Sequence, residues 1–470
     1  MSPVNTLFDS GDSGNPGDHG TPPSPPGGRI AWAEILVAAG AFAVLCIVVL
    51  AKATRLVEPD DYAYRAAIIA LTHGHIILTN TQYQDLLQQL GTAAQPGIEQ
   101  WTHLANGSWV SEKIPGYSFF AAPFQMLGML RLAPLFYGAL GCFGLFVGAR
   151  RWLGRWGGTW AVVLFCSSGA AISFAWRATM PTFTDASLIA AGTGALLWTL
   201  LATEASGRGR TVVGLLAFLA LEGATFIRFT DGVILLVAVI AVLLARRAAQ
   251  LSLRMLTCWS ASLVGFVALV AAYNAMFYGG ATKTGYTAGV ITFSLGALLP
   301  NLKDMPAHLV SSMPFVILAA VAVVWIAVRA VHSRRSGFDR SLRAAHRRDA
   351  AVGAALCASW IGIYGLYLAY DWTVSLAGGQ GSTIQVIRFY VPALAAVALL
   401  GAWLITRLPR WTAFGTLAVI VCLGAVSYPG LANTVLARPG GPAGQGELIG
   451  SPPNGQAPSG APPRAAPAGP

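Results

Sequence analysis

Two adjacent carboxylates, Asp60 and Asp61, are the residues of this sequence best suited by type and spacing to chemistry. They open a segment with apolar residues at helical spacing, which predicts an amphipathic helix on a membrane surface over residues 61–78. Acids at this position cap free backbone N–H groups. Because one cap needs only one acid, we also consider a carboxylate that acts as general base toward a hydroxyl group.

Cations flank two later apolar runs. Lys113 stands in segment 112–117, just before such a run, where it either snorkels to lipid headgroups or holds a lipid phosphate. Arg388 opens the segment 388–394, again at the beginning of an apolar run. Ionisable residues at membrane depth are costly to keep, so a function is the default hypothesis for them.

Further ionisable residues lie at or inside predicted spans. Asp185 heads one span, where it is either a helix cap or a second reactive acid. Arg228 and Asp231 occupy a short turn between two spans and either pair with each other or serve a site. We expect Glu222, inside the run 211–228, to pair with Arg228 or to line a cavity.

Metal-binding patterns are weak in this sequence. His73 and His75 are two apart on a predicted helix and so point to different faces. All six cysteines lie inside apolar runs without metal-ligand spacing, as expected for small buried residues. The sequence therefore indicates no metal site and no cofactor, and a divalent cation stays an open alternative.

The composition places these residues on a membrane protein. Of 470 residues, 55% are hydrophobic and 10% are charged, whereas soluble domains carry about 25% charged residues. This predicts an all-α polytopic transmembrane bundle of roughly 11 to 13 spans, at about 20 residues a span. The apolar runs are 30–51, 118–150, 159–176, 185–202, 211–228, 231–245, 256–277, 308–330, 351–370, 389–406 and 411–428.

One run, 118–150, is too long for a simple span. Parity of the topology favours one crossing plus a helix near the outer surface, and a tight hairpin is the alternative.

Outside the predicted bundle of residues 30–430, the Gly/Pro-rich tails 1–29 and 431–470 are predicted to be disordered. The first run has no cleavage site and is expected to be a membrane anchor.

Orientation follows from the arginines, which gather in a few loops, most strongly over residues 329–348. Excess Lys and Arg marks cytoplasmic loops, so the net charge of +11 does not indicate a nucleic-acid partner. The N-terminus is then cytoplasmic and the C-terminus extracytoplasmic, in a multi-pass plasma-membrane protein. Residues 52–117 lie outside, together with Arg177, Asp185, Arg228 and the loops 277–308 and 371–390.

The order of these motifs resembles the GT-C class of membrane glycosyltransferases, which includes protein O-mannosyltransferases and lipid A aminoarabinose transferases. An acidic pair follows the first span, Lys-x-Pro-Gly-Tyr opens an apolar run at Lys113, and Arg-Phe-Tyr-x-Pro-Ala begins at Arg388. Many members have Lys-Pro-Pro where this chain has Lys-Ile-Pro. The segment 273–286 is similar to an outer-loop pattern of actinobacterial members.

The resemblance implies that a sugar moves from a polyprenyl-phosphate carrier to a glycan, lipid or protein hydroxyl with inversion at the anomeric carbon. It makes Asp60 the base, with Asp61 and Asp185 as further catalytic acids. The donor phosphate is expected to bind three cations: Lys113, Arg388 and Arg228. Four residues are expected to contact substrate: Tyr64, His73, Tyr117 and Tyr390.

Two other functions compete with this interpretation. A transporter or flippase for lipid-linked substrates predicts binding sites at the bilayer midplane between internal repeats. No repeat is seen, and the polar residues are predicted to gather at one face. A non-catalytic envelope protein remains an alternative, because each candidate residue also fits a role as a cap or an anchor.

Overall fold

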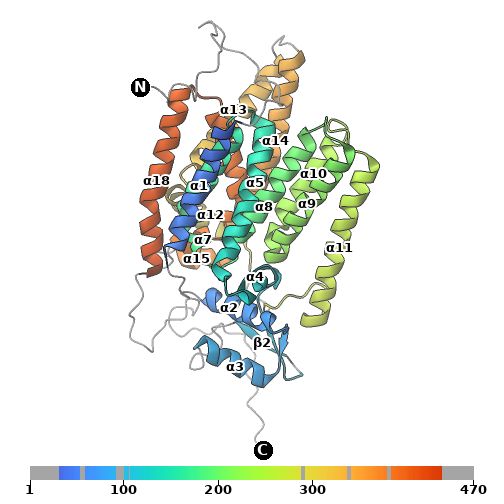
Figure 1. Ribbon diagram of the computed structural model, residues 1–470, viewed down its shortest axis with the longest axis vertical. Helices are drawn as coiled ribbons and strands as arrows, with labels where there is room; N and C mark the ends of the chain where they lie inside the picture. The colour runs from blue at the N-terminus through green and yellow to red at the C-terminus, as the bar shows by residue number, and fades with distance from the viewer. Residues whose placement is uncertain are drawn as a thin grey trace, which may run out of the picture.

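The computed structural model of the chain describes residues 31–52, 59–91, 100–104, 106–286, 292–335, 340–377 and 383–436. Figure 1 shows a bundle of long, roughly parallel helices with a smaller helical and stranded layer at one end. The predicted tail 1–29, the C-terminal tail beyond residue 436, and parts of the predicted loops lie outside the described residues. The last helix runs to Leu436 and so enters the predicted C-terminal tail.

Within the described residues, eight helices are long and apolar enough to cross a membrane. They are α1 (Trp32–Leu50), α5 (Ala133–Leu153, extended by a 3-10 turn from Leu130), α8 (Thr182–Leu201), α9 (Gly207–Ile227), α11 (Leu253–Tyr278), α13 (Val316–Arg335), α14 (Arg340–Leu368) and α18 (Arg410–Leu436). A ninth span results if α6 (Gly157–Ser167) and α7 (Gly169–Trp176), which meet at 62°, cross together. The predicted polytopic helical bundle is confirmed.

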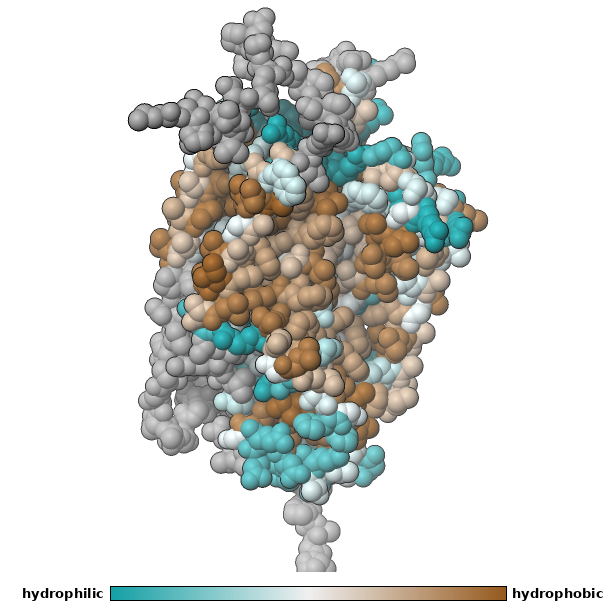
Figure 2. All heavy atoms as spheres, in the orientation of Figure 1, coloured by the Kyte–Doolittle hydropathy of each residue, from teal (hydrophilic) through white to brown (hydrophobic). Residues whose placement is uncertain are grey.

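Two shorter apolar helices complete the set of predicted runs. They are Phe229–Ala245, which contains α10 (Gly232–Ala245), and Val391–Ile405, which contains α17 (Leu394–Ile405). α17 lies in the centre of the protein, and every one of its residues is buried. Figure 2 shows apolar side chains across the middle of the visible face, with hydrophilic side chains toward both ends.

Two predicted apolar runs divide into separate helices. Run 118–150 divides into the short helix α4 (Gly116–Met126) and the span that includes α5, as the single-crossing interpretation expected. Run 308–330 contains a break, because α12 (Leu298–Ser312) ends before the span of α13 begins at Val316. Pro314 lies in this break, and the residue before a proline is disfavoured in helical geometry.

The layer at one end of the bundle contains α2 (Pro59–Thr72), α3 (Asn80–Leu90) and a small sheet. Its strands β1 (Ile77–Leu78), β3 (Trp109–Ser111) and β2 (Trp101–His103) pair antiparallel in that order. The predicted helix 61–78 is therefore too long. It ends at Thr72 because Gly74 adopts a left-handed backbone with φ of +79°, and the chain then turns into β1.

Close backbone contacts hold this layer to the bundle. A Cβ atom on Gly116 would lie 2.3 Å from the carbonyl oxygen of Phe226, so α4 touches the end of α9 directly. A Cβ on Gly285 would lie 2.7 Å from the Cα atom of Glu112, which brings the chain after α11 against residue 112. Both contacts tolerate only glycine, and both position residues next to Lys113.

Candidate active site

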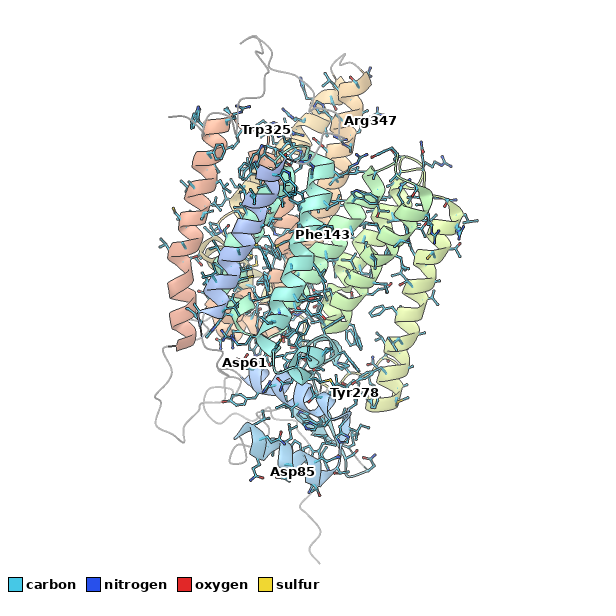
Figure 3. The ribbon with its side chains drawn as sticks, viewed as in Figure 1. Asp61, Asp85, Phe143, Tyr278, Trp325 and Arg347 are labelled. Atoms are coloured by element: carbon cyan, nitrogen blue, oxygen red, sulfur yellow. The ribbon has the colours of Figure 1, made fainter. Side chains whose placement is uncertain are left out.

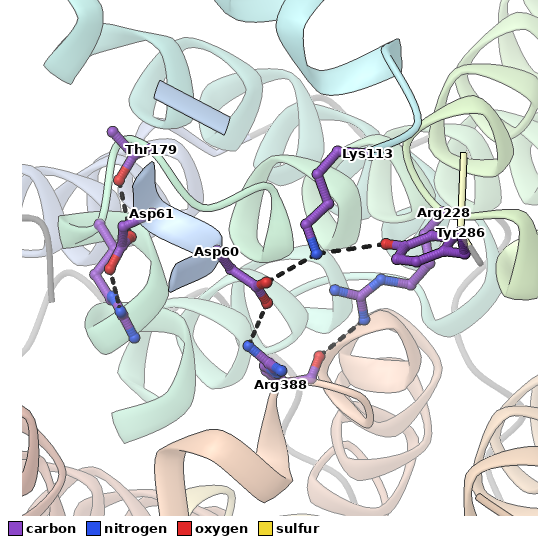
Figure 4. A network of polar contacts seen from close by, with 8 residues as sticks. Asp60, Asp61, Lys113, Thr179, Arg228, Tyr286 and Arg388 are labelled. Atoms are coloured by element: carbon purple, nitrogen blue, oxygen red, sulfur yellow. Dashed lines mark hydrogen bonds and ion pairs between the residues drawn. The ribbon is translucent and has the colours of Figure 1, made fainter. Parts of the chain in front are cut away.

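Asp60 is the centre of a cluster of charged side chains that are far apart in the sequence. Its Oδ1 atom accepts a hydrogen bond from Lys113 Nζ at 2.8 Å, and its Oδ2 atom accepts one from Arg388 NH1 at 2.6 Å. Figure 4 shows the two cations on either side of the carboxylate. The side chains of Asp60, Lys113 and Arg388 are 18%, 8% and 11% exposed, so the cluster is mostly, but not fully, removed from water.

Three separate parts of the chain supply these side chains. Asp60 lies in the first turn of α2, where its charge also favours the helix N-terminus. Lys113 lies between β3 and α4, and its backbone N–H donates to Ser111 Oγ at 3.1 Å. Arg388 directly follows the short helix α16 (Thr383–Ile387). The contact of Gly116 with α9 holds the Lys113 turn over the end of the bundle.

Aromatic rings surround both cations. Lys113 Nζ lies 5.8 Å and 5.3 Å from the ring centroids of Tyr64 and Tyr286, and 3.5 Å from the Tyr286 hydroxyl oxygen. The Arg388 guanidinium lies 4.8 Å from the ring centroids of both Trp372 and Phe389. Such contacts stabilise a cation without neutralising it. Each cation therefore keeps its charge beside Asp60.

The charge state of Asp60 follows from this geometry. Burial by itself would raise the pKa of the carboxyl group, but the neighbouring Lys113 and Arg388 outweigh burial and bring the pKa well below its usual range. Asp60 is thus ionised at neutral pH. While both cations contact it, Asp60 is a weak base, and its basicity increases when those cations bind another anion.

Arg228 extends the cluster toward the bundle core. Its NH1 atom donates to the carbonyl oxygen of Arg388 at 3.0 Å, and its Nε atom lies 3.9 Å from Asp185 Oδ2. Asp185 and Asp231 are buried, at 0% and 1% exposure. Asp185 therefore joins the cluster through Arg228, and among the described contacts the ion pair of Arg228 is with Asp185. Glu222 does not pair with Arg228 among the described contacts; it accepts from Ser262 Oγ at 2.9 Å.

Asp61 belongs to a different set of contacts. Its side chain is fully buried, forms an ion pair with Arg177, and accepts a hydrogen bond from Thr179 Oγ1 at 2.8 Å. Tyr117 lies beside this pair, and its hydroxyl donates to the carbonyl oxygen of Ala178. Figure 4 shows Asp61 directed away from Asp60 toward Thr179. These contacts fix α2 to the segment between α7 and α8.

The four predicted substrate contacts have different positions. Tyr64 lies beside Lys113, and Tyr117 lies with the Asp61 pair. Tyr390 is buried against Tyr364, with ring centroids 5.0 Å apart. His73 is exposed beyond the far end of α2, and its Nδ1 atom contacts the Ile69 carbonyl oxygen at 2.9 Å. Thirteen residues of helix correspond to about 20 Å, so His73 is not part of the Asp60 cluster.

Two residues of the site had no role in the sequence interpretation, namely Arg177 and Tyr286. Arg177 could have been found in the sequence, because an ionisable residue at the end of an apolar run is a candidate for a function. Tyr286 belongs to segment 273–286, whose resemblance assigned it no role, and its position next to Lys113 depends on the contact of Gly285 with Glu112. Among the described residues, no three His, Cys, Asp or Glu side chains converge as metal ligands.

Comparison with known proteins gives structural neighbours only. No family model matches the chain, and no curated protein matches it. Among solved structures, ArnT from Cupriavidus metallidurans bound to undecaprenyl phosphate is 16% identical, with a TM-score of 0.47 over 82% of this chain. The oligosaccharyltransferase of Archaeoglobus fulgidus is 12% identical, with a TM-score of 0.49 over 86% of this chain.

The matched regions span 62% of the ArnT chain and 56% of the oligosaccharyltransferase chain. Apo ArnT is also similar, at 16% identity and a TM-score of 0.38, over 80% of this chain and 77% of that one.

Proposed function

We propose that this protein transfers a sugar from a polyprenyl-phosphate carrier to a hydroxyl acceptor at the Asp60 end of the bundle. The observation that carries the proposal is one carboxylate held between two cations, with Arg228 beside them, at the end of a transmembrane bundle. A carboxylate supplies a base, and the cations supply stabilisation for a phosphate. Both are what glycosyl transfer from a lipid phosphate requires.

The proposed binding step is an exchange of ion pairs. The phosphodiester of the donor carries one negative charge and takes Lys113 and Arg388 from Asp60. The pKa of Asp60 then rises toward that of an ordinary carboxyl group, because the two charges that lowered it now face the phosphate. Donor binding thus converts Asp60 from a weak base into a competent one.

In the chemical step, the acceptor hydroxyl gives its proton to Asp60 while its oxygen attacks the anomeric carbon. The bond between that carbon and the phosphate oxygen breaks, and polyprenyl phosphate leaves with a second negative charge. Lys113 and Arg388 stabilise this additional charge, so the leaving group needs no proton. Because attack occurs opposite the leaving oxygen, the anomeric configuration inverts.

The remaining predicted residues take supporting roles in this proposal. Arg228 holds the backbone of Arg388 and is itself oriented by Asp185. Asp61 is a positioning residue, because its pair with Arg177 fixes the first turn of α2 from which Asp60 projects. Tyr64 and Tyr286 offer aromatic surface next to Lys113 for the sugar or the carrier.

We place the Asp60 end outside the cytoplasm. Figure 3 shows Asp61 and Arg347 toward opposite ends of the bundle, and the arginine-rich end is the cytoplasmic one by the positive-inside rule. Single cysteines at positions 106 and 347 test the assignment with an impermeant thiol reagent in intact cells. Labelling is expected at position 106, and labelling at position 347 alone would reverse the topology.

The function is tested by a transfer assay in membranes with a panel of radiolabelled polyprenyl-phosphate sugars. Wild-type membranes should transfer one of these sugars, and Asp60→Asn should reduce the rate by about 10²–10⁴-fold at normal protein abundance. Asp85→Asn is the matched control, because Asp85 is an exposed carboxylate on α3 in the same layer. Transfer by Asp60→Asn at the wild-type rate would show that Asp60 is not the base.

A further inference from the structure

A large apolar pocket lies at the end of the bundle away from Asp60. Its volume is about 1030 Å³, and its walls come from α8, α9, α10 and α14. Its lining includes Leu200, Ile234 and Leu244. Ile240 and Leu244 line the pocket and yet are 45% and 82% exposed, so the pocket opens sideways to the surroundings of the bundle. In a membrane protein, those surroundings are lipid.

Arginines line one end of this pocket. Arg343, Arg347 and Arg348 belong to the lining, and none of them forms an ion pair within the described part of the chain. The Nε atom of Arg348 is buried and has no hydrogen-bond partner among the described residues. The three cations therefore offer unneutralised charge to a ligand inside the pocket.

The nearest acid in the sequence does not neutralise them. Asp349 accepts hydrogen bonds from Trp152 at 3.0 Å and from Trp403 at 3.1 Å, and it pairs with Arg407 at 3.1 Å. These contacts commit both carboxylate oxygens of Asp349 to the core between α5, α14 and α17. Asp349 therefore does not balance the positive charge of the three arginines that line the pocket.

The face of α14 that lines the pocket carries arginines at one end and small residues along the rest. Arg343 and Arg347 are four residues apart on one helix face, and that row continues through Ala351, Ala355 and Ser359, all of which line the pocket. Cations thus stand at one end of the row, and small side chains that leave space follow. From Arg347 to Ser359 the helix rises about 18 Å, close to the roughly 15 Å depth of one hydrocarbon leaflet.

We propose that this pocket binds one anionic phospholipid of the membrane leaflet at the Arg347 end of the bundle. The phosphate of the headgroup contacts the three arginines, and the acyl chains lie between α10 and α14. Basic pockets between transmembrane helices are suited to acidic headgroups. The length of the row fits chains that cross one leaflet, whereas a polyprenyl chain is much longer. The site is separate from the Asp60 cluster, so the inference does not depend on the proposed function.

Native mass spectrometry of the full chain, purified from mixed phosphatidylglycerol and phosphatidylethanolamine, tests the proposal. One phosphatidylglycerol should remain bound, and titration of the delipidated protein should show preference for it over phosphatidylethanolamine. The triple variant R343Q/R347Q/R348Q should weaken this binding by about tenfold or more, because each basic residue contributes to attraction of an anionic headgroup.

Two further variants separate the pocket from charge in general. R208Q/R246Q/R254Q removes the same charge from exposed arginines at the neighbouring helix ends that do not line the pocket, and it should leave binding within about twofold. Ala355→Phe fills the pocket without a change of charge, and it should reduce binding while the protein stays monodisperse.

Three results would overturn the inference. The first is equal retention of the two lipids by the wild-type protein. The second is equal loss of binding in the two triple variants. The third is displacement of phosphatidylglycerol by undecaprenyl phosphate at lower concentration, which would assign the pocket to the polyprenyl carrier.

Discussion

The same substitution, Asp to Asn, should lower the stability of the protein at Asp61 and the rate of transfer at Asp60. Asp61 is 0% exposed and pairs with Arg177, which is itself 1% exposed. Asp61→Asn keeps the shape of the side chain but removes the negative charge that Asp61 places against the buried Arg177. Removal of one partner from a buried ion pair costs about 3–5 kcal/mol. The retained amide oxygen still accepts from Thr179, so we expect the lower end of this range.

Asp60→Asn should instead affect turnover. Its side chain is 18% exposed, and both cations that it contacts also lie against aromatic rings, so they lose less when the carboxylate is removed. The loss of stability should be smaller than for Asp61→Asn, while transfer falls by about 10²–10⁴-fold. Asn caps a helix about as well as Asp, so a mere capping role predicts no change in rate.

The assay has two readouts, which are the fraction of monodisperse protein after a heating series in detergent and the initial rate of transfer at low temperature. Asp61→Asn should lower the midpoint of the heating series and keep much of the rate per folded molecule. The double variant D61N/R177M replaces the buried pair by neutral groups and should recover much of the stability. The reasoning would be refuted by a stable Asp61→Asn protein, or by a double variant no more stable than Asp61→Asn alone.

Three other predictions concern the donor site, pH and packing. Lys113→Ala should raise the KM for the donor by about 10- to 150-fold, which corresponds to the loss of a charge-assisted hydrogen bond of about 1.5–3 kcal/mol. Lys113→Arg should recover part of this loss. Unchanged KM values would show that Lys113 does not bind the phosphate. The pKa of Asp60 is lower in the folded protein than in the unfolded chain, where it is about 3.9. The ion pairs of Asp60 therefore stabilise the fold fully above about pH 3.9, and this stabilisation disappears as the pH falls through the pKa of the folded protein. The acid limb of kcat/KM should therefore lie below that pH in the wild type and move up in Lys113→Ala, and an unmoved limb would mean that Asp60 is not the titrating group. Gly194→Ala should destabilise the protein, because its Cβ would lie 2.0 Å from the Gly144 carbonyl oxygen where α5 and α8 touch, whereas Gly40→Ala, with nothing within 4 Å, should be silent in the same heating series.

Some of the fold was predictable from the sequence because its cause is local. A run of about 20 apolar residues is itself sufficient reason for a span, and each predicted run corresponds to helical structure. The errors occurred where a single residue changes the backbone. Gly74 ends α2 earlier than the apolar spacing indicated, and Pro314 lies in the break between α12 and α13. The short strands of the small sheet depend on partners up to about 30 residues away, which periodicity does not reveal.

The sequence by itself determined which residue types were candidates, because charge is costly at membrane depth and only a few ionisable residues stand at span ends. It could not decide between Asp60 and Asp61. Adjacent residues on a helix point about 100° apart, so one reaches Lys113 and Arg388 while the other reaches Arg177. Which direction faces the cluster depends on how α2 packs against the bundle. That packing is set by contacts between distant segments, such as Gly116 on Phe226, and only the tertiary structure contains them.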